Sequence, residues 1–402
     1  MSRSRGATAL ALGSAVSGLL AYVFFALATR ALGAEAAAPV AVLWTYWSFA
    51  TAALTFPLQH WIVRVVAAAG GAEGPVRHAM RTIPALVVAT ALLTGVVAWA
   101  GREALFHHDG WSFPLLVLVV TLGSAFVGVV RGVLTARHRL VAVGVALVAE
   151  NGLRCALAAA LMASDVTSAR YYGLALAAGQ LIGFAWPSTL RLGRAGPTDR
   201  PWLGFVAGAA GGQVIAQAVL TGGPVALAFL GGSPAEVTGL FAALALFRAP
   251  YTVALGAVAP ATGALTRLVV SGRHGTIRRL LGALVAATLL GTGVAAFVGW
   301  FAGPALLRLV FGTSVDVAAW VCLLTAVGSS IALGTLSLSL MAMAHDRSHT
   351  ILRSWLIAAV AAGGMLVAGP GSPLTTVTLA FLTAQGVGFA TLLAGQLVRK
   401  PR

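Results

Sequence analysis

Apolar stretches of about twenty residues alternate with short polar or Gly/Pro-rich breaks along the whole chain. A helix of that length crosses a hydrocarbon core about 30 Å thick, because each residue advances it by about 1.5 Å. We therefore predict an all-α polytopic membrane protein with twelve transmembrane helices. They span Ala7–Ala28, Pro39–Val63, Ile83–Ala100, Ser112–Val130, Leu140–Ala163, Tyr171–Leu190, Leu203–Leu230, Val237–Thr266, Leu280–Phe301, Val317–Met343, Ile351–Ala368 and Leu374–Val398.

The composition agrees with this interpretation. Hydrophobic residues make up 59% and charged residues 9% of the 402 positions, whereas roughly a quarter of the residues in a soluble domain are charged. A formal net charge of +16 would favour nucleic-acid binding if the basic residues were clustered. They are scattered between the apolar stretches instead, so we predict no nucleic-acid partner.

The basic residues also predict the orientation. Twenty of the 26 Lys and Arg residues fall in loops on one side and four on the other. Because cytoplasmic loops are enriched in Lys and Arg, the twenty mark the cytoplasm, where both chain ends are then expected. The twenty are Arg3, Arg5, Arg64, Arg77, Arg81, Arg131, Arg137, Arg139, Arg191, Arg194, Arg200, Arg267, Arg273, Arg278, Arg279, Arg347, Arg353, Arg399, Lys400 and Arg402; the four are Arg30, Arg102, Arg170 and Arg308.

The first apolar run follows Arg3 and Arg5 as the apolar core of a cleavable signal peptide would. It is longer than the usual core of about 7–15 residues, and its removal would disturb the alternation of loop charge. We therefore keep it as the first transmembrane helix.

Two stretches of the third predicted helix recur in the ninth. Ala85–Thr90 matches Ala283–Thr288, and Gly95–Ala98 matches Gly293–Ala296 at the same offset. This predicts two six-helix lobes, 1–190 and 203–402, joined by a cytoplasmic linker, 191–202. An even number of helices in each lobe makes the repeats parallel, related by a pseudo-twofold axis along the membrane normal.

Few ionisable residues lie inside the predicted helices, and such residues mark transport pathways. Glu150 and Arg154 lie four residues apart and share one face of the fifth helix. Either they form an ion pair that locks helices together, or they have a functional role in which Glu150, the one intramembrane acid, exchanges a proton. Both interpretations stay open.

Arg248 lies about 18 Å along the eighth helix from Glu236, with no acid on a neighbouring turn. A central arginine costs about 2.5–3.5 kcal/mol on insertion scales. Water, Glu150 from the other lobe or an anionic substrate group would offset that cost, and a guanidinium suits phosphate because it binds two oxygens at once. An interhelical lock is the alternative.

Polar and aromatic side chains provide further candidates. Gln213 and Gln217 share one face of the seventh helix, where they either line a cavity or bond neighbouring helices. Four aromatic residues in the second helix either stack on a sugar or form a lipid-facing belt. They are Trp44, Tyr46, Trp47 and Phe49.

The sequence contains no soluble catalytic machinery. There is no Walker GxxxxGK[ST], HExxH or GxSxG motif, and no outer loop is long enough to fold as a domain. Cys155 and Cys322 lie in apolar stretches without CxxC or Cys/His spacing, so we predict neither a disulfide nor a metal site. We expect no cofactor and no enzymatic activity.

Three segments carry a resemblance to a known family: one closes the first helix, one follows the fourth and one lies in the eighth. They are Ala28-Thr29-Arg30-Ala31-Leu32-Gly33, Arg131-Gly132-Val133-Leu134-Thr135-Ala136-Arg137, and Gly239-Leu240-Phe241-Ala242-Ala243 with Arg248-Ala249-Pro250 and Pro260. With the twelve-helix layout, they resemble the polysaccharide and lipid-linked oligosaccharide flippases of the multidrug/oligosaccharidyl-lipid/polysaccharide (MOP) exporter superfamily.

The resemblance implies two six-helix bundles forming a V around a basic cavity that opens alternately to the two sides of a bacterial cytoplasmic membrane. The cargo would be undecaprenyl-pyrophosphate-linked sugar, with Arg248 and Arg154 contacting the pyrophosphate and Gln213 and Gln217 the sugar. Membrane lipids, glycosyltransferases and a polysaccharide polymerase would be the partners. The chain departs from the family in having few charged cavity residues.

Three other classes compete with a flippase. A multidrug exporter of the same superfamily would need intramembrane acids for organic cations, and a major-facilitator transporter would carry a Gly-x-x-x-Asp-Arg-x-Gly-Arg pattern that Arg64–Arg81 lacks. A membrane glycosyltransferase or ligase would need acids in an outer loop, where Asp109 beside His107 and His108 forms the one candidate cluster.

Overall fold

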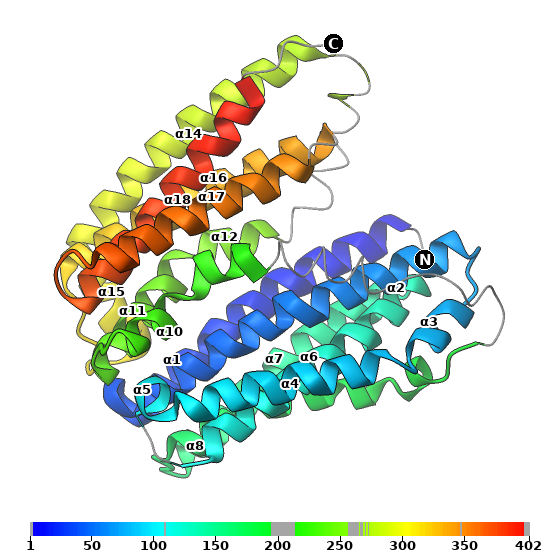
Figure 1. The fold of residues 1–402 in the computed structure, drawn as a ribbon, viewed down its shortest axis with the longest axis horizontal. Coiled ribbons are helices and arrows are strands. Elements are labelled where there is room, and N and C mark those ends of the chain that lie inside the picture. The colour runs from blue at the N-terminus through cyan, green and yellow to red at the C-terminus, as the bar shows by residue number, and fades with distance from the viewer. Residues whose placement is uncertain are drawn as a thin grey trace. The chain divides into compact units, whose positions relative to one another are not determined.

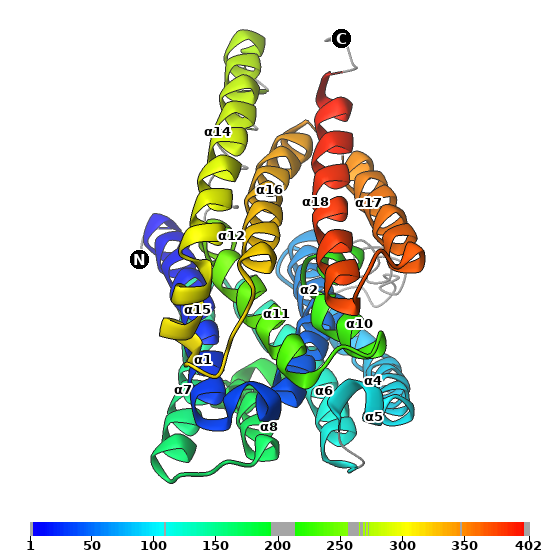
Figure 2. The same cartoon turned by 90° about the vertical axis from the view of Figure 1, so that its left-hand side faces the viewer.

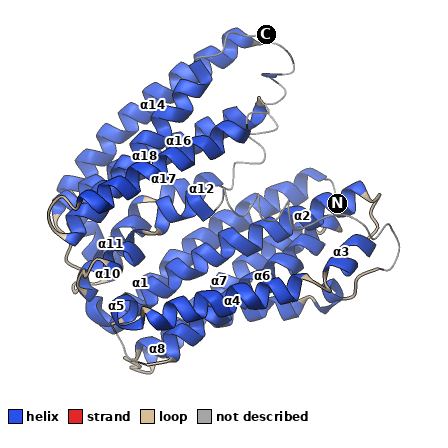
Figure 3. Cartoon of the chain, viewed as in Figure 1, coloured by secondary structure: helices blue, strands red, loops and turns tan. Residues whose placement is uncertain are grey.

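A computed structural model describes residues 3–107, 110–193, 214–255, 273–345 and 348–397, with isolated positions 265, 268, 269 and 271. The elements in these ranges are helices, and no strand occurs among them (Figure 3). By contacts, the chain divides into two compact units, Met1–Gln217 and Ala218–Arg402, which we call unit 1 and unit 2. Most of the predicted linker 191–202 lies outside the described residues, and the predicted lobe boundaries stay a prediction.

Unit 1 contains eight α-helices and three π- or 3-10-helical elements within its described part (Figure 1). The α-helices are α1 Arg3–Ala50, α2 Phe56–Ala68, α3 Gly74–Ala79, α4 Ile83–Ala100, α5 Arg102–Phe106, α6 Ser112–Ala136, α7 Leu140–Ala163 and α8 Ala169–Ala178. A π-helix, η1 Thr51–Thr55, joins α1 to α2, and two 3-10 helices, η2 Gly179–Ala185 and η3 Pro187–Leu190, follow α8.

Unit 2 has eight complete α-helices in its described part, and residues 214–221, at the end of unit 1 and the start of unit 2, are also helical. In Figure 2, α14, α16, α18 and α17 form a row in which each helix packs against the next. The eight are α10 Gly223–Phe229, α11 Pro234–Phe247, α12 Ala249–Leu255, α14 His274–Phe301, α15 Gly303–Phe311, α16 Ala319–Ala344, α17 Ser348–Ala368 and α18 Pro373–Leu397.

The predicted fold class is confirmed. Every predicted transmembrane helix overlaps helical residues of the described chain, and eight of these stretches are long and apolar enough to cross a membrane, or nine with the bent pair α11–α12. The predicted first and second helices count as one stretch because only Gly33, with φ of 79°, interrupts α1. A backbone at that φ suits glycine, which has no Cβ to collide with it.

Several arginines assigned to loops lie inside helices instead, among them Arg131 and Arg30. Arg131 was expected in a cytoplasmic loop, but α6 continues to Ala136 and Arg131 is only 7% exposed. Arg30, expected in an outer loop, is an exposed residue within α1. The predicted helices were wrong here for one reason: each was taken to end at the first charged residue after an apolar run. A helix can continue past such a residue when the charged side chain is paired or reaches water. Moving both residues leaves the predicted excess of basic residues on one side in place.

The helix pairing supports the predicted internal repeat. In unit 1, α6 packs against α2, α4 and α8, and in unit 2, α16 packs against α11, α14 and α18. A short helix follows both α4 and α14, namely α5 and α15. The Thr94 hydroxyl on α4 lies 3.3 Å from that of Thr121 on α6, and Thr292 on α14 lies 3.4 Å from Ser330 on α16. Thr94 and Thr292 are related by the offset of the sequence repeat.

Helices α1 and α7 run side by side in the same direction. Their packing positions the residues of the site described below. At their closest approach, a Cβ on Gly13 would lie 2.8 Å from Gly144 Cα. One turn farther, the Ser17 hydroxyl donates to the Leu147 carbonyl at 2.9 Å and accepts a 2.8 Å hydrogen bond from the Asn151 amide. Small residues allow this approach, and hydroxyl and amide groups bond helices within apolar surroundings.

Candidate functional site

Two buried arginines of unit 1 contact Glu150, which lies midway along α7. One carboxylate oxygen accepts a 2.7 Å hydrogen bond from Arg154, one turn farther along the same helix. The other accepts from Arg131 on α6. The exposed fractions are 2% for Glu150, 0% for Arg154 and 7% for Arg131. We call these three residues the Arg–Glu–Arg cluster.

Arg154 is enclosed on every side. Its Nε donates to the Leu176 carbonyl at 2.8 Å, and one terminal nitrogen donates to the Asn151 side-chain oxygen at 2.9 Å. Its guanidinium carbon lies 4.2 Å from the centre of the Trp47 ring, so the cation also faces an aromatic surface. Gly179 at the start of η2 completes the enclosure, because a Cβ there would collide with Arg154 Nε. The predicted pairing of Arg154 with Glu150 is present.

Sequence reasoning missed Arg131, although it faces the other side of the same carboxylate. The sequence offered a signal at the end of α6, where Arg137 and Arg139 flank His138. In the structure α6 ends at Ala136, and His138 has a φ of 57° that no right-handed helix allows. This segment, rather than Arg131, therefore marks the end of the apolar helix. Arg131 lies five residues before Ala136 and, counted along the helix, about 8 Å deeper.

The cluster carries one excess positive charge in a buried environment, because two guanidinium groups share one carboxylate. Removing charged groups from water costs free energy. Their mutual attraction offsets this cost only when the geometry is good and their hydrogen bonds are made. Arg154 meets that condition. Arg131 meets it in part, since its Nε has no hydrogen-bond partner among the described residues.

The aromatic residues of the second predicted helix face the interior of unit 1. Trp44 is 6% exposed and packs against Phe24 at 5.7 Å and Trp47 at 5.6 Å between ring centres. A lipid-facing belt is therefore wrong for Trp44. Trp47 instead places its ring beneath Arg154, so one of these aromatic side chains belongs to the site.

The π-helix η1 begins four residues after Trp47. The hydroxyl of Thr55, its last residue, donates to the Ser124 carbonyl at 2.7 Å. A Cβ on Gly128 of α6 would lie 2.8 Å from Thr55 Cα, so the two backbones touch. A single π-turn inside an α-helix often occurs beside a functional site, since it rotates the side chains that follow.

Arg248 occupies a different environment from the one predicted. It caps α11 where that helix and α12 meet at a bend of 50°, and it donates a hydrogen bond to the Leu220 carbonyl. Both oxygens of Glu150 are bonded within unit 1, and compensation of Arg248 by Glu150 stays a prediction. Gln217 is half-buried, and Gln213 lies outside the described residues.

The fourth and sixth helices of each lobe share a polar motif that sequence reasoning also missed. Gly123-Ser124 recurs as Gly328-Ser329, and Gln180-x-x-Gly183 recurs as Gln385-x-x-Gly388 at the same offset. The Gln180 amide donates to the Val120 carbonyl at 2.9 Å and to the Ser124 hydroxyl at 3.0 Å. In the described part of unit 2, the fully buried amide of Gln385 has no such partner.

A second ion pair lies at the ends of the helices, on the side predicted to face the cytoplasm. Arg137 donates two hydrogen bonds to the Glu73 carboxylate, at 2.6 and 2.9 Å, and two more to the carbonyls of Ser188 and Arg191. The Gly193 backbone N–H also donates to Glu73 at 2.9 Å. These contacts connect the α2–α3 turn, the end of α6 and the segment that follows η3.

The Arg137–Glu73 pair is expected to make stability depend on pH. The hydrogen bond from Arg137 holds the pKa of Glu73 below its ordinary value near 4.5, although partial burial opposes the shift. A lowered folded-state pKa stabilises the fold above the unfolded pKa, and this contribution is lost as the pH falls through the folded pKa. The difference in thermal midpoint between wild type and Glu73→Gln should therefore shrink from about pH 7 to about pH 3.

Glu103 is the matched control, because its carboxylate is 72% exposed and lies 3.5 Å from Arg102. Its substitution by glutamine should change the midpoint little at any pH, since exposed pairs contribute little. A Glu73→Gln difference that stays constant over the same range would contradict the assigned role of this pair.

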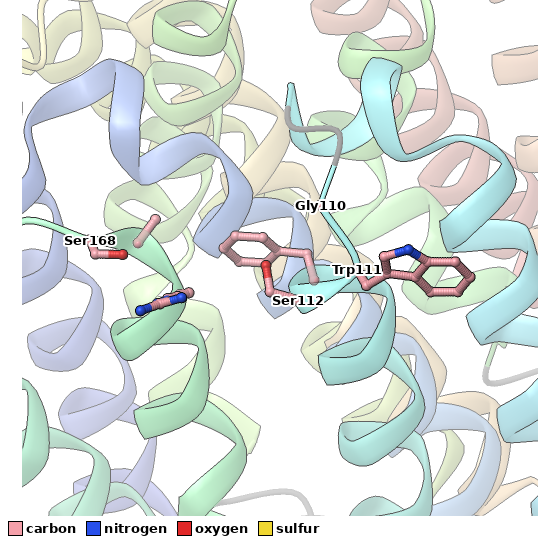
Figure 4. A pocket seen from close by; sticks show the side chains of 7 residues that line it. Gly110, Trp111, Ser112 and Ser168 are labelled. Atoms are coloured by element: carbon pink, nitrogen blue, oxygen red, sulfur yellow. The ribbon is translucent and has the colours of Figure 1, made fainter.

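One pocket lies apart from the cluster (Figure 4). It has a volume of about 390 Å³ and is lined by the segment entering α6, including Trp111 and Ser112, and by the start of α8, including Ser168 and Arg170. Arg170 is bonded to its neighbour, since it donates to the Tyr171 hydroxyl at 2.9 Å. None of the predicted site residues lines this pocket.

The other candidate chemistry receives no support from the described residues. In that part of the chain, no group of three His, Cys, Asp or Glu residues is placed to hold a metal ion. Of the cluster considered for glycosyl transfer, His107 is an exposed residue at the end of α5, and His108 and Asp109 lie outside the described ranges.

Comparison with known proteins places the fold. No protein-family model matches the sequence, and no curated protein matches it. Among solved structures, an inward-facing multidrug resistance MATE family transporter of the MOP superfamily matches with a TM-score of 0.71 and 14% identity, over 95% of this chain and 94% of that one. The lipid II flippase MurJ, in an inward closed conformation, matches with a TM-score of 0.72 and 11% identity, over 98% and 88%.

A MOP superfamily transporter from Pyrococcus furiosus Vc1 matches with a TM-score of 0.61 and 14% identity, over 97% of this chain and 95% of that one. That protein is described as having a binding pocket of reverse polarity that suggests a different function. At such identities the similarity concerns the fold, and it extends over nearly the whole chain. The resemblance drawn from the sequence is thus confirmed: the chain has the fold of the MOP superfamily transporters.

Proposed function

We propose that this protein is a transporter that moves an anionic, lipid-linked sugar across a bacterial cytoplasmic membrane by alternating access, with both chain ends in the cytoplasm. The substrate class is an undecaprenyl-pyrophosphate-linked oligosaccharide or polysaccharide repeat unit. The observation that carries the proposal is the Arg–Glu–Arg cluster, a buried site with excess positive charge in a fold shared with transporters and a lipid flippase.

Positive charge inside apolar helices favours an anionic cargo. Charge-assisted hydrogen bonds to phosphate oxygens are strong, and arginine binds them in a two-pronged geometry. A pyrophosphate group also explains why a membrane protein would retain arginines that are expensive to insert. Arg154 supports such a site by holding Glu150, and Arg248 and Gln217 are proposed to contact the substrate together with Gln213.

A MATE-type exporter of small molecules is the second candidate. The MATE transporters among the structural neighbours favour it, since they match over as much of the chain as the lipid flippase does. It would require an acid to attract organic cations, and the one acid of the cluster, Glu150, already bonds two arginines. A glycosyltransferase or ligase is not proposed, because the neighbours are transporters and flippases.

Reconstitution tests the proposal. Proteoliposomes containing the protein and fluorescent polyprenyl-pyrophosphate sugars should show movement of the label from the inner to the outer leaflet. Movement of an organic cation instead of the sugar would favour the MATE-type alternative. The partners would be glycosyltransferases that build the lipid-linked unit and a polymerase that consumes it.

Replacing Arg248 by alanine is expected to slow the movement of the lipid-linked sugar about tenfold or more. A hydrogen bond to a charged group contributes about 1.5–3 kcal/mol, and each 1.4 kcal/mol is about a factor of ten. The initial rate of label movement is the measurement. Arg308→Ala is the control, since Arg308 is exposed on α15 and its Nε reaches only the Pro304 carbonyl of its own helix. Equal rates for Arg248→Ala and wild type would refute a substrate contact at Arg248.

A further inference from the structure

The two arginines of the Arg–Glu–Arg cluster differ in how firmly they are held. Each of the three guanidinium nitrogens of Arg154 donates to a side chain or a carbonyl of unit 1, and the residue is fully buried. Arg131 makes its hydrogen bond with Glu150, its Nε has no partner among the described residues, and its side chain is 9% exposed. Arg154 is thus a fixed part of the fold, and Arg131 retains donors for a ligand.

We propose that Arg131 binds an oxyanion of the substrate in exchange for Glu150, which takes up a proton as the oxyanion arrives. This deepens the proposed function, on which it rests, by naming the contact residue and the proton acceptor of the same site. The ligand chemistry is a phosphate or sulfate oxygen, whether free or attached to a lipid.

Charge balance favours the exchange. Before it, two guanidinium groups and one carboxylate give the cluster a net charge of +1. The arriving oxyanion adds one negative charge at the contact, and the proton adds one positive charge. Together they leave the net charge unchanged. Afterwards Arg131 pairs with the oxyanion, neutral Glu150 remains beside Arg154, and the net charge is again +1. Because burying an uncompensated charge is expensive, the coupled event is favoured over anion binding alone.

The surroundings let the side chains exchange without moving the helices. A Cβ on Gly132, next to Arg131, would lie 2.9 Å from Ile62 on α2, so α6 is packed directly against α2 there. The Thr135 hydroxyl donates to the Arg131 carbonyl at 2.7 Å. The backbone of Arg131 is therefore fixed, and in the proposed exchange only its side chain rotates away from Glu150.

The groups facing Glu150 also favour a proton on this residue rather than on another. Arg131 faces it from α6 and Arg154 from its own helix; α1 contributes the Trp47 ring over Arg154, and the η2 segment contributes Gly179. Among these described neighbours there is no second acid. Once protonated, Glu150 keeps a carbonyl oxygen that accepts from Arg154, so the neutral form stays hydrogen-bonded.

Linkage makes the exchange measurable. When one proton is taken up with each oxyanion, affinity for the oxyanion rises as the pH falls, by up to about tenfold per pH unit. Glutamine at position 150 imitates the protonated acid in shape and hydrogen bonding but cannot take up a proton. Glu150→Gln should therefore bind the oxyanion more tightly than wild type at neutral pH and with little dependence on pH.

The experiment is calorimetric titration of the full chain in detergent, in two buffers of different ionisation enthalpy. The first probe is inorganic sulfate, whose charge is constant between about pH 5 and about pH 8, and the second is farnesyl pyrophosphate. Wild type should take up about one proton per oxyanion bound, Glu150→Gln none, and Arg131→Gln should lose binding. If the protein binds farnesyl pyrophosphate but not sulfate, the site is assigned to a lipid-linked diphosphate. If it binds both probes, the site accepts an oxyanion of either source.

The wild-type titration alone decides whether a proton is taken up, so the test does not depend on the stability of a variant. Sulfate and farnesyl pyrophosphate binding with no proton uptake by wild type, or equal uptake by wild type and Glu150→Gln, would overturn the exchange. Sugar movement in proteoliposomes without Glu150-dependent proton uptake would overturn the exchange and leave the transport function standing. Proton-linked oxyanion binding without sugar movement would support the exchange and overturn the transport function.

Discussion

Replacing Arg154 by methionine is expected to lower the free energy of unfolding by about 3–5 kcal/mol. The substitution removes a buried cation from a carboxylate, leaves the Leu176 carbonyl and the Asn151 side-chain oxygen without a donor, and removes the contact with Trp47. Methionine fills much of the same volume, so the loss measures hydrogen bonding and charge rather than a cavity. Denaturation in mixed micelles, followed by tryptophan fluorescence, gives the free energy.

Arg170→Met is the control for this prediction. Arg170 is exposed at the start of α8 and contacts Tyr171, the residue beside it. Its loss should change stability by no more than about 0.5 kcal/mol, as is usual for surface substitutions. If Arg154→Met were as stable as Arg170→Met, the enclosure of Arg154 would not contribute to the fold as described.

Substitution of Gly13 by alanine is expected to lower the free energy of unfolding by about 1–3 kcal/mol, the usual result of overpacking. The added Cβ would lie 2.8 Å from Gly144 Cα and 2.9 Å from its carbonyl oxygen, so the backbones of α1 and α7 would have to separate. Separation would also weaken the hydrogen bonds of Ser17 one turn away. The same mixed-micelle denaturation measures the effect.

Gly152 on α7 provides the matched control, because a Cβ there meets no atom within 4 Å. Gly152→Ala should raise stability by up to about 1 kcal/mol, since alanine is the better helix former. The two Gly→Ala substitutions are therefore expected to have opposite signs. A stabilising Gly13→Ala would show that α1 and α7 are not held at this close approach.

Much of this architecture could be predicted from the sequence because it follows from local rules. Transmembrane helices need about twenty apolar residues, and residues four apart share a helix face, which was sufficient for the helix layout and the Glu150–Arg154 pair. The break near Gly33 and the bend beside Pro250 also fell in Gly- or Pro-containing segments, where backbone hydrogen bonding is weakest.

The remaining features of the site could not be predicted because they depend on tertiary packing. Arg131 was placed in a loop, since a charge at the end of an apolar run looks the same whether it meets water or a buried acid. Its partnership with Glu150, nineteen positions away, exists only because α6 and α7 pack together. Likewise, nothing in the order of residues indicates that Trp47 lies against Arg154.

The internal repeat has a consequence for how the two halves of the chain divide their labour. Both halves of the chain carry the repeated Gly-Ser and Gln-x-x-Gly motifs. They differ in their acids: α7 carries Glu150, whereas α17, which packs against α18 as α7 packs against α8, contains no Asp or Glu. The two helices that correspond in the repeat are therefore chemically unequal, and a proton accepted at Glu150 would have no counterpart on α17.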